Sequence, residues 1–344
     1  MKKTIAKFGN NEFTAIDLSD QTYSDWQEYR SKSILIGGSE VGAILGINPY
    51  NDALSLWASK IGFVRDTFIP SEASAGGHID EDGILKRLTH WDGMVWVPHF
   101  TNEQTFRKIS KPPYTYLPED APFIALNIDG AITDDKDYPG MFGVAEAKKI
   151  SSHVATKYIG RVPSYYIAQL CAYMYYLRAD FGRIALLEDG VKLNVMTIDA
   201  TSFEYQTFVA QFWRLKRFYE ATEAGVIAME STKDPEDRRS LALTLIKEFS
   251  DVLYVTENSK YMLDGVKSSK EYTVVRTDDL DLYVESYLEL SDNKKEVDAQ
   301  LETVKNMIRL YMEQTMADSI VSNRYKITNS KQGQYKVLKV TKLS

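Results

Sequence analysis

Two strand-like segments near the middle of the chain constrain its fold more than any other feature. Residues 123–133 and 142–150 are rich in apolar and β-branched residues, and the intervening segment 134–140 is polar and turn-like. The pattern predicts two neighbouring strands joined by a turn. Each strand carries ionisable side chains within its apolar run, which is unusual for strands that belong to a sheet interior.

The ionisable residues of these strands have a defined spacing. Side chains alternate between the two faces of a strand, so Glu146 and Lys148 point the same way. Asp129 lies in the preceding strand and can sit beside Glu146. Two converging carboxylates make a hard oxygen site for Mg²⁺ or Mn²⁺, and a neighbouring lysine can position and help deprotonate a water. These are the parts that phosphodiester cleavage needs.

The same residues have a simpler interpretation. An acid-x-Lys sequence also occurs on solvated strand faces, and Asp129 followed by Gly130 is also a common turn sequence. The spacing alone leaves both interpretations open.

Helical patterns surround this strand pair. We expect a helix that begins within 24–33, and another over 39–45 with Ser39 as its N-cap. We also predict a helix over 203–225 that ends on a glycine cap, and a hairpin formed by 183–187 and 191–198. The further expected elements are a helix at 53–61, a helix from near Gly76, a strand at 94–100 and an apolar helix at 164–177.

Composition changes after residue 230. Residues 231–239 are polar and charged and resemble a linker, so we predict a domain over 1–230 and an extension over 231–344. The extension is predicted to hold a helical region at 282–316 and a hairpin at 325–340. Apolar residues of the helical region follow a short heptad-like stripe, typical of packing on its own domain or of a dimeric coiled coil: Val297, Leu301, Val304, Ile308 and Tyr311.

Composition excludes several classes of protein. The 344 residues contain one cysteine, Cys171, which rules out an internal disulfide, a Cys-x-x-Cys zinc site and a cysteine-bound iron–sulfur cluster. No run of roughly 18 apolar residues occurs, so we expect a soluble cytoplasmic protein without a membrane association. The net charge of −7 argues against non-specific coating of DNA, which usually needs a basic face.

An ordered series of motifs resembles the YqaJ-like viral recombinases and the lambda-exonuclease type of alkaline exonucleases. Both belong to the PD-(D/E)xK nuclease superfamily. The resemblance extends from residue 26 to about 225. The motifs are IGGSEVGAILGINPY at 36–50 with Leu56-Trp57, GHIDE at 77–81, NIDG at 127–130, AEAKK at 145–149 and VPSYYIAQL at 162–170.

This resemblance implies roles for individual residues. Asp129, Glu146 and the backbone carbonyl of Ala147 would bind metal, and Lys148 would act on the attacking water. Glu81 would bind metal directly or through water; the alternatives are a surface glutamate or an exchange of roles with Asp80. The helix residues Tyr166 and Gln169 would reach the scissile phosphate, or serve helix packing alone.

The resemblance also implies a binding site for a terminal 5′ phosphate. Arg30 and Ser39 would form it, since arginine binds phosphate bidentately and a helix start adds backbone donors. The alternative is a surface arginine beside an ordinary helix cap.

The fold implied is an α/β, restriction-endonuclease-like core: a mixed central sheet flanked by helices, with a helical and hairpin extension. The activity implied is a Mg²⁺-dependent 5′-to-3′ exonuclease, with Mn²⁺ as a substitute, that digests one strand from double-stranded DNA ends for phage-type recombination. The partners implied are a ring-shaped homo-oligomer such as a trimer and a single-strand annealing protein, in the cytoplasm of a bacterial host.

Three other functions remain open from the sequence. The first is a related endonuclease or nickase, and the second is a non-catalytic DNA-end-binding or scaffold protein. The third is an unrelated α/β protein with a coiled-coil tail. The intact trio of Asp129, Glu146 and Lys148 argues against a scaffold, which has no need of it.

Overall fold

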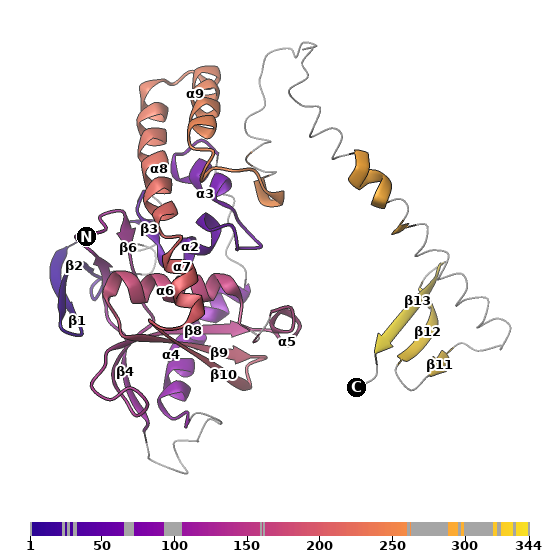
Figure 1. The fold of residues 1–344 in the computed structure, drawn as a ribbon, viewed down its shortest axis with the longest axis horizontal. Helices are drawn as coiled ribbons and strands as arrows, with labels where there is room; N and C mark the ends of the chain where they lie inside the picture. Colours follow the sequence, from indigo (N-terminus) through magenta and orange to yellow (C-terminus); the bar gives the residue numbers. More distant parts are fainter. Residues whose placement is uncertain are drawn as a thin grey trace. The chain divides into compact units, whose positions relative to one another are not determined.

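The chain divides by its internal contacts into two units, Met1–Lys270 and Glu271–Ser344, which we describe separately. The computed structural model (Figure 1) describes most of the first unit and short parts of the second. The described residues are 2–22, 25, 28–29, 33–64, 72–92, 105–158, 160, 162–259, 262, 288–294, 297–298, 319–321, 325–332 and 335–342.

A five-stranded mixed sheet forms the centre of the first unit (Figure 1). Its strand order is β10-β9-β8-β7-β4, and β8 runs parallel to β9 while the other neighbours are antiparallel. The predicted mixed sheet flanked by helices is confirmed. The strands are β4 (Arg107–Ser110), β7 (Gly130–Asp135), β8 (Gly143–Ile150), β9 (Phe181–Glu188) and β10 (Lys192–Asp199).

Helices α4 (Glu72–Thr89) and α6 (Ser164–Leu177) cover opposite faces of this sheet (Figure 1). The alternation of side chains along the strands shows which face belongs to which helix. Val144 of β8 and Ile184 of β9 belong to the same buried cluster as the α6 residues. Ala145 and Ala185, one position further on, belong to the cluster that contains Ile84 and Leu88 of α4.

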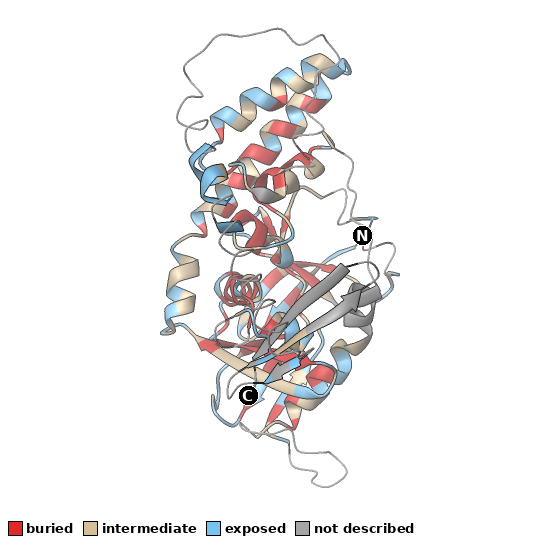
Figure 2. Cartoon of the chain, turned by 90° about the vertical axis from the view of Figure 1, so that its right-hand side faces the viewer, coloured by how far each residue is buried: buried red, intermediate tan, exposed pale blue. Residues whose placement is uncertain are grey.

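The remaining elements of the first unit extend this core. Strands β1 (Lys3–Phe8), β2 (Asn11–Asp17) and β5 (Tyr114–Leu117) form a second sheet, and β3 (Ile36–Gly37) pairs with β6 (Ile124–Ala125). In the view of Figure 2, buried residues lie on the strands and on the helices that pack against them. The other helices are η1 (Gly38–Glu40), α2 (Val41–Ile44), α3 (Ala53–Lys60), α5 (Ser152–Ala155), α7 (Phe203–Val209), α8 (Trp213–Ser231), α9 (Pro235–Glu248) and η3 (Glu257–Ser259).

Most predicted elements are present. The helix at 164–177 has the bounds expected, and the hairpin of β9 and β10 turns at Asp189 and Gly190, both of which have positive φ. Helix α4 begins before Gly76, and the strand expected at 94–100 lies outside the described residues. Of the helix expected within 24–33, the structure describes only residues 25, 28, 29 and 33.

The single helix predicted for 203–225 is wrong in two respects. The segment forms two helices, α7 and α8, and Gly225 lies buried inside α8 rather than at a C-cap. A Cβ atom at Gly225 would lie 2.6 Å from Ile61 Cγ2 and 3.1 Å from Trp57 Nε1. The glycine therefore serves close packing of α8 on α3, one helical turn from the hydrogen bond that Trp57 Nε1 donates to the Ala221 carbonyl at 2.9 Å.

The linker predicted at 231–239 is also wrong. Asp234 caps α9 by accepting hydrogen bonds from the backbone amides of Glu236 and Asp237, and Pro235 starts the helix. The polar residues are the capped first turn of a helix that packs on α8. The domain boundary after residue 230 stays a prediction; the first compact unit extends to Lys270.

The second unit contains an antiparallel sheet of β11 (Ser319–Val321), β12 (Tyr325–Gln332) and β13 (Tyr335–Lys342). The predicted hairpin is therefore present. Val297 of the predicted helical stripe is helical and exposed, whereas Leu301, Val304, Ile308 and Tyr311 lie outside the described residues. None of the described helices combines the length and the apolar composition needed to cross a bilayer.

We predict that Gly225→Ala destabilises the protein. The added methyl group overpacks the contact with Ile61 and Trp57, at a cost of about 1–3 kcal/mol. Gly83→Ala is the control, because Gly83 is an exposed position of α4 with no atom near its Cβ, and alanine there favours the helix by about 1 kcal/mol. Urea denaturation measures both. Equal stability of the two variants would refute the packing role of Gly225.

Candidate active site

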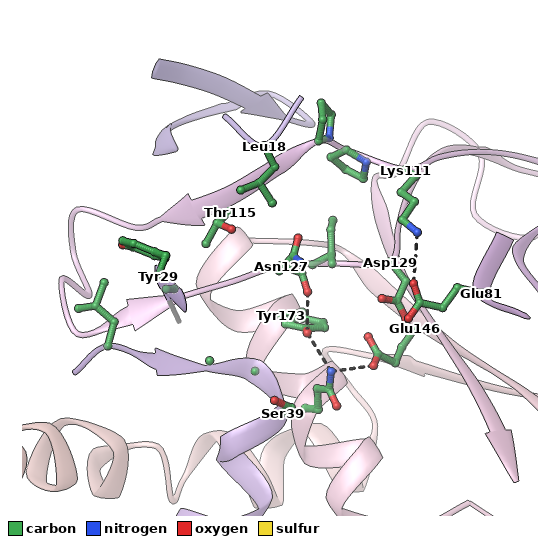
Figure 3. A pocket seen from close by; sticks show the side chains of 18 of the residues that line it. Leu18, Tyr29, Ser39, Glu81, Lys111, Thr115, Asn127, Asp129, Glu146 and Tyr173 are labelled. Carbon is green, nitrogen blue, oxygen red and sulfur yellow. Dashed lines mark hydrogen bonds and ion pairs between the residues drawn. The ribbon is translucent and has the colours of Figure 1, made fainter. Parts of the chain in front are cut away.

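A cavity of about 580 Å³ opens beside the carboxyl-rich part of the sheet. Its lining includes Asp129, Glu146 and Lys148, together with Glu81 from α4. The single strand predicted over 123–133 is wrong, because the segment divides into β6 and β7 and Asp129 lies just before β7 rather than within a strand. Figure 3 shows Asp129, Glu146 and Glu81 facing one another at one end of the cavity. The antiparallel pairing of β7 with β8, which sets Gly130 opposite Ala145, brings Asp129 next to Glu146.

Glu146 is the most deeply buried of these groups, with a side chain that is 0% exposed. Its Oε1 accepts a hydrogen bond from Gln169 Nε2 at 2.7 Å and forms an ion pair with Lys148. Its Oε2 is buried and has no hydrogen-bond partner in the described part of the chain. Burial and the nearby charge of Asp129 raise the pKa of Glu146 to about 8.

Asp129 lies directly before β7 and is anchored through its own carboxylate. The backbone amide of Ala147 donates to Asp129 Oδ2 at 2.9 Å, so β8 holds one oxygen of the carboxylate. Burial raises the pKa of Asp129, and the charge of Lys148 opposes that shift. Two buried carboxylates with raised pKa values in one place are typical of a functional site.

Lys148 follows Glu146 on the same face of β8, as the strand alternation predicted. Its side chain is 23% exposed, and its Nζ lies 5.5 Å from the ring centroid of Tyr166. Burial alone would lower the pKa of Lys148, but the charges of Glu146 and Asp129 outweigh it and the pKa is raised. The lysine is therefore a cation that faces the cavity.

Glu81 reaches the cavity from the opposite helix. It forms an ion pair with Lys111, whose Nζ lies 3.2 Å from Glu81 Oε2 and 3.2 Å from Asp82 Oδ1. Asp80 pairs with Lys149 at 2.7 Å and does not line the cavity. The alternative in which Asp80 exchanges roles with Glu81 therefore has no support from the geometry.

A chain of hydrogen bonds from α6 holds Glu146 in place. Gln169 Nε2 donates to Glu146 and also to Tyr173 OH at 2.8 Å, and Tyr173 OH donates to the Asn127 carbonyl at 2.8 Å (Figure 3). Gln169 therefore hydrogen-bonds to the Glu146 carboxylate, whereas the resemblance implied that it would reach the scissile phosphate. Tyr173 and Lys111 were missed by the sequence analysis, although Tyr173 lies one helical turn after Gln169 and shares its face.

The other predicted residues are placed less centrally. Tyr166 is half-buried against Tyr165 and lies beside Lys148, but it does not line the cavity. Ser39 is exposed and lines the cavity, and Arg30 lies outside the described residues. The prediction of Ser39 as an N-cap is wrong. Gly37 takes the cap position, and its backbone amide donates to Glu40 Oε2 at 2.9 Å.

The donor set of the cavity suits a hard divalent cation. Asp129 and Glu146 converge there, and an orphaned buried oxygen of Glu146 lacks any other partner among the described residues. Within the same residues, no group of three or more His, Cys, Asp or Glu side chains is arranged closely enough to hold a metal as it stands. A complete coordination shell around a divalent cation would need further oxygen donors, such as the Ala147 carbonyl, water or a substrate phosphate.

Comparison with known proteins identifies the segment that carries this site. Residues 25–179 match the model of the YqaJ-like viral recombinase domain. This segment is therefore similar to a YqaJ-like viral recombinase domain. The uncharacterized protein YqaJ of Bacillus subtilis (strain 168) is 25% identical over 177 residues, which are 51% of this chain and 49% of that protein. The chain thus spans about half the length of the curated relative that it matches.

Two solved structures resemble this chain with low sequence identity and a low TM-score. An alkaline exonuclease (LHK-Exo) from Laribacter hongkongensis is 14% identical with a TM-score of 0.43, over 60% of this chain and 96% of that chain. Its complex with dAMP matches with the same values. At this TM-score the likeness carries no argument about the site.

We predict that Tyr173→Phe destabilises the protein by about 1–3 kcal/mol. Without the hydroxyl, the side-chain amide of Gln169 and the backbone carbonyl of Asn127 each lose a hydrogen bond. Tyr175→Phe is the control, since Tyr175 lies on the same helix and is 45% exposed. The free energy of unfolding in urea measures both. Equal losses in the two variants would show that the hydrogen-bond chain through Tyr173 OH does not form.

Proposed function

We propose that this protein is a Mg²⁺-dependent DNA exonuclease that digests one strand of a duplex from its 5′ end. Mn²⁺ would substitute for Mg²⁺. The observation that carries the proposal is the convergence of Asp129, Glu146 and Lys148 on one cavity, with an unpartnered buried oxygen on Glu146. The match of residues 25–179 to the model of the YqaJ-like viral recombinase domain supports the same activity.

Each residue has a task in this proposal. Asp129 and Glu146 would hold the cation, with the Ala147 carbonyl, and Glu81 would join from α4 directly or through water. When bound, Mg²⁺ supplies a Lewis acid that activates water and neutralises charge on the phosphate. Lys148 then orients the attacking water and offsets negative charge that develops on the scissile phosphate.

Residues outside the cation site would position the others. Gln169 would hold Glu146 in the rotamer that faces the cavity, and the hydrogen bond to Tyr173 would hold the Gln169 side chain in its orientation. Tyr166 shields the flank of Lys148. Lys111 pairs with Glu81 at the edge of the site and would be a candidate contact for a substrate phosphate.

The proposal extends to partners. A homo-oligomeric ring, such as a trimer, would enclose duplex DNA, and a single-strand annealing protein would receive the strand left behind. A ring reconciles the net charge of −7 with DNA binding, because only the inner surface must be positive. The support for these partners is the family of residues 25–179 alone.

We predict that Lys148→Ala and Glu146→Gln each lower the release of mononucleotides from end-labelled linear duplex DNA by at least about 100-fold. Lys149→Ala is the matched control, because Lys149 is the next residue of β8 and pairs with Asp80 outside the cavity. Chelation of Mg²⁺ by EDTA should abolish release by the wild type, and covalently closed circular DNA should stay intact.

Other outcomes of this assay favour the alternatives. Cleavage of closed circles would favour an endonuclease or nickase. Binding of DNA ends by the wild type without any release would favour an end-binding protein. Equal activity of Lys148→Ala and Lys149→Ala would show that Lys148 takes no part in the cleavage reaction.

The 5′-phosphate site proposed for Arg30 and Ser39 has a separate test. The wild type should digest 5′-phosphorylated ends faster than 5′-hydroxyl ends, and Ser39→Ala should reduce that preference by roughly tenfold through loss of a hydrogen bond to a charged group. Ser231→Ala, at the exposed end of α8, is the control. A preference that Ser39→Ala leaves unchanged would place the phosphate elsewhere.

A further inference from the structure

The cavity continues well beyond its carboxylates. In the view of Figure 3, Leu18, Tyr29 and Thr115 lie at the end away from Asp129 and Glu146, and Asn127 lies between the two ends. A cation and a phosphate group fill only part of about 580 Å³, a volume typical of sites for whole small molecules. We call the end away from the carboxylates the distal arm and define it by Leu18, Tyr29 and Thr115; Pro112 and Pro113, which follow Lys111 in the chain, line the wall of the cavity as well.

The distal arm has the surface of a site for a flat ring. Leu18 follows strand β2, Tyr29 is half-buried, and Pro112 and Pro113 form the connection between β4 and β5. Aromatic and proline rings with an aliphatic side chain make walls on which a planar ring stacks. These walls carry no charge, so they suit the uncharged part of a ligand whose charged part lies at the cation end.

A polar group of the distal arm lacks a partner. Thr115 of β5 is 4% exposed, and its hydroxyl oxygen is buried without a hydrogen-bond partner in the described part of the chain. A buried hydroxyl left unpaired costs free energy, and native proteins usually satisfy such groups. The hydroxyl turns about its Cα–Cβ bond between staggered positions, so it can face a ligand in the cavity that Thr115 lines.

Asn127 supplies the second polar group. Its backbone carbonyl accepts from Tyr173, which holds it beside the cation end. Its side chain lines the cavity and offers both donors and an acceptor. Because Asn127 lies between the two ends of the cavity, its amide can hydrogen-bond to the sugar of a nucleotide whose base lies in the distal arm.

We propose that the distal arm binds the base of the nucleotide at the strand end, with Thr115 as its hydrogen-bonding residue. This inference rests on the proposed function, because the exonuclease assignment identifies the charged part of the ligand as phosphate. The base stacks between Tyr29, Leu18 and the prolines, and the sugar lies near Asn127. The scissile phosphate then lies at Asp129 and Glu146, and Ser39 lines the same cavity for a terminal phosphate.

The test measures binding of a product that the enzyme cannot cleave. Isothermal titration calorimetry with Mg²⁺ compares thymidine 5′-monophosphate with 2-deoxyribose 5-phosphate, which lacks the base. The wild type should bind thymidine 5′-monophosphate at least about tenfold more tightly, as stacking of one base provides. Thr115→Val should weaken that binding by roughly 3- to 10-fold and leave deoxyribose 5-phosphate unchanged.

Matched variants separate binding from folding. Thr115→Ser retains the hydroxyl and should bind as the wild type does, and Thr133→Val changes an exposed threonine of β7 as a control. Thr115→Val should be as stable as the wild type or more stable, because it removes an unpaired buried hydroxyl. A loss of affinity with retained stability is therefore a binding effect.

Three results would overturn the proposal: equal affinities of the wild type for the two compounds, no binding of thymidine 5′-monophosphate, or unchanged binding by Thr115→Val. Mononucleotide release from linear duplex DNA, measured on the same preparations, judges the exonuclease assignment independently. Active digestion without base-dependent binding would refute the base site in the distal arm and leave the exonuclease proposal standing. Base-dependent binding without digestion would keep the nucleotide site and remove the nuclease.

Discussion

The parallel pairing of β8 with β9 is the constraint on which the site depends. Parallel neighbours cannot be joined by a tight turn, so the chain must cross one face of the sheet between them. Helix α6 makes that crossing. It packs over the face that carries Val144 and Glu146, and a carboxylate that would otherwise face solvent becomes buried beneath a helix.

Burial of Glu146 then determines much of what surrounds it. A carboxylate without water needs partners, and the described residues supply Gln169 and Lys148 to one of its oxygens only. Loss of hydration is the largest cause of the raised pKa of both Glu146 and Asp129, and a second carboxylate adds to it, Asp129 for Glu146 and Glu81 for Asp129. A divalent cation would relieve both penalties at once. Under the proposed function, the burial that makes the site costly to fold would also give it affinity for a cation.

The far end of β7 is held by a different device. Asp135 is fully buried, and its Oδ2 lies 2.9 Å from Arg107 Nε of β4 and 2.9 Å from Arg183 Nε of β9. Hydrogen bonds offset part of the cost of burying such charges, and Arg107 Nη1 also donates to the carbonyls of Leu88 and Trp91. The charge pairs tie β4, β7 and β9 together at the end opposite Asp129. The strand that presents Asp129 is thus anchored at both ends, which keeps its position relative to Glu146 fixed.

Several local features of this protein follow from its sequence alone. Strand alternation put Glu146 and Lys148 on one face, the apolar run 164–177 predicted α6 with its observed bounds, and the motif order pointed to the YqaJ-like family. Only the tertiary structure decided that Glu81 rather than Asp80 lines the cavity, that Gly225 packs inside a helix, and that Tyr173, Lys111 and Thr115 surround the site. The reason is physical: periodicity and capping act between residues close in the chain, whereas burial, ion pairing and close approach depend on segments that meet only when the sheet and its helices assemble.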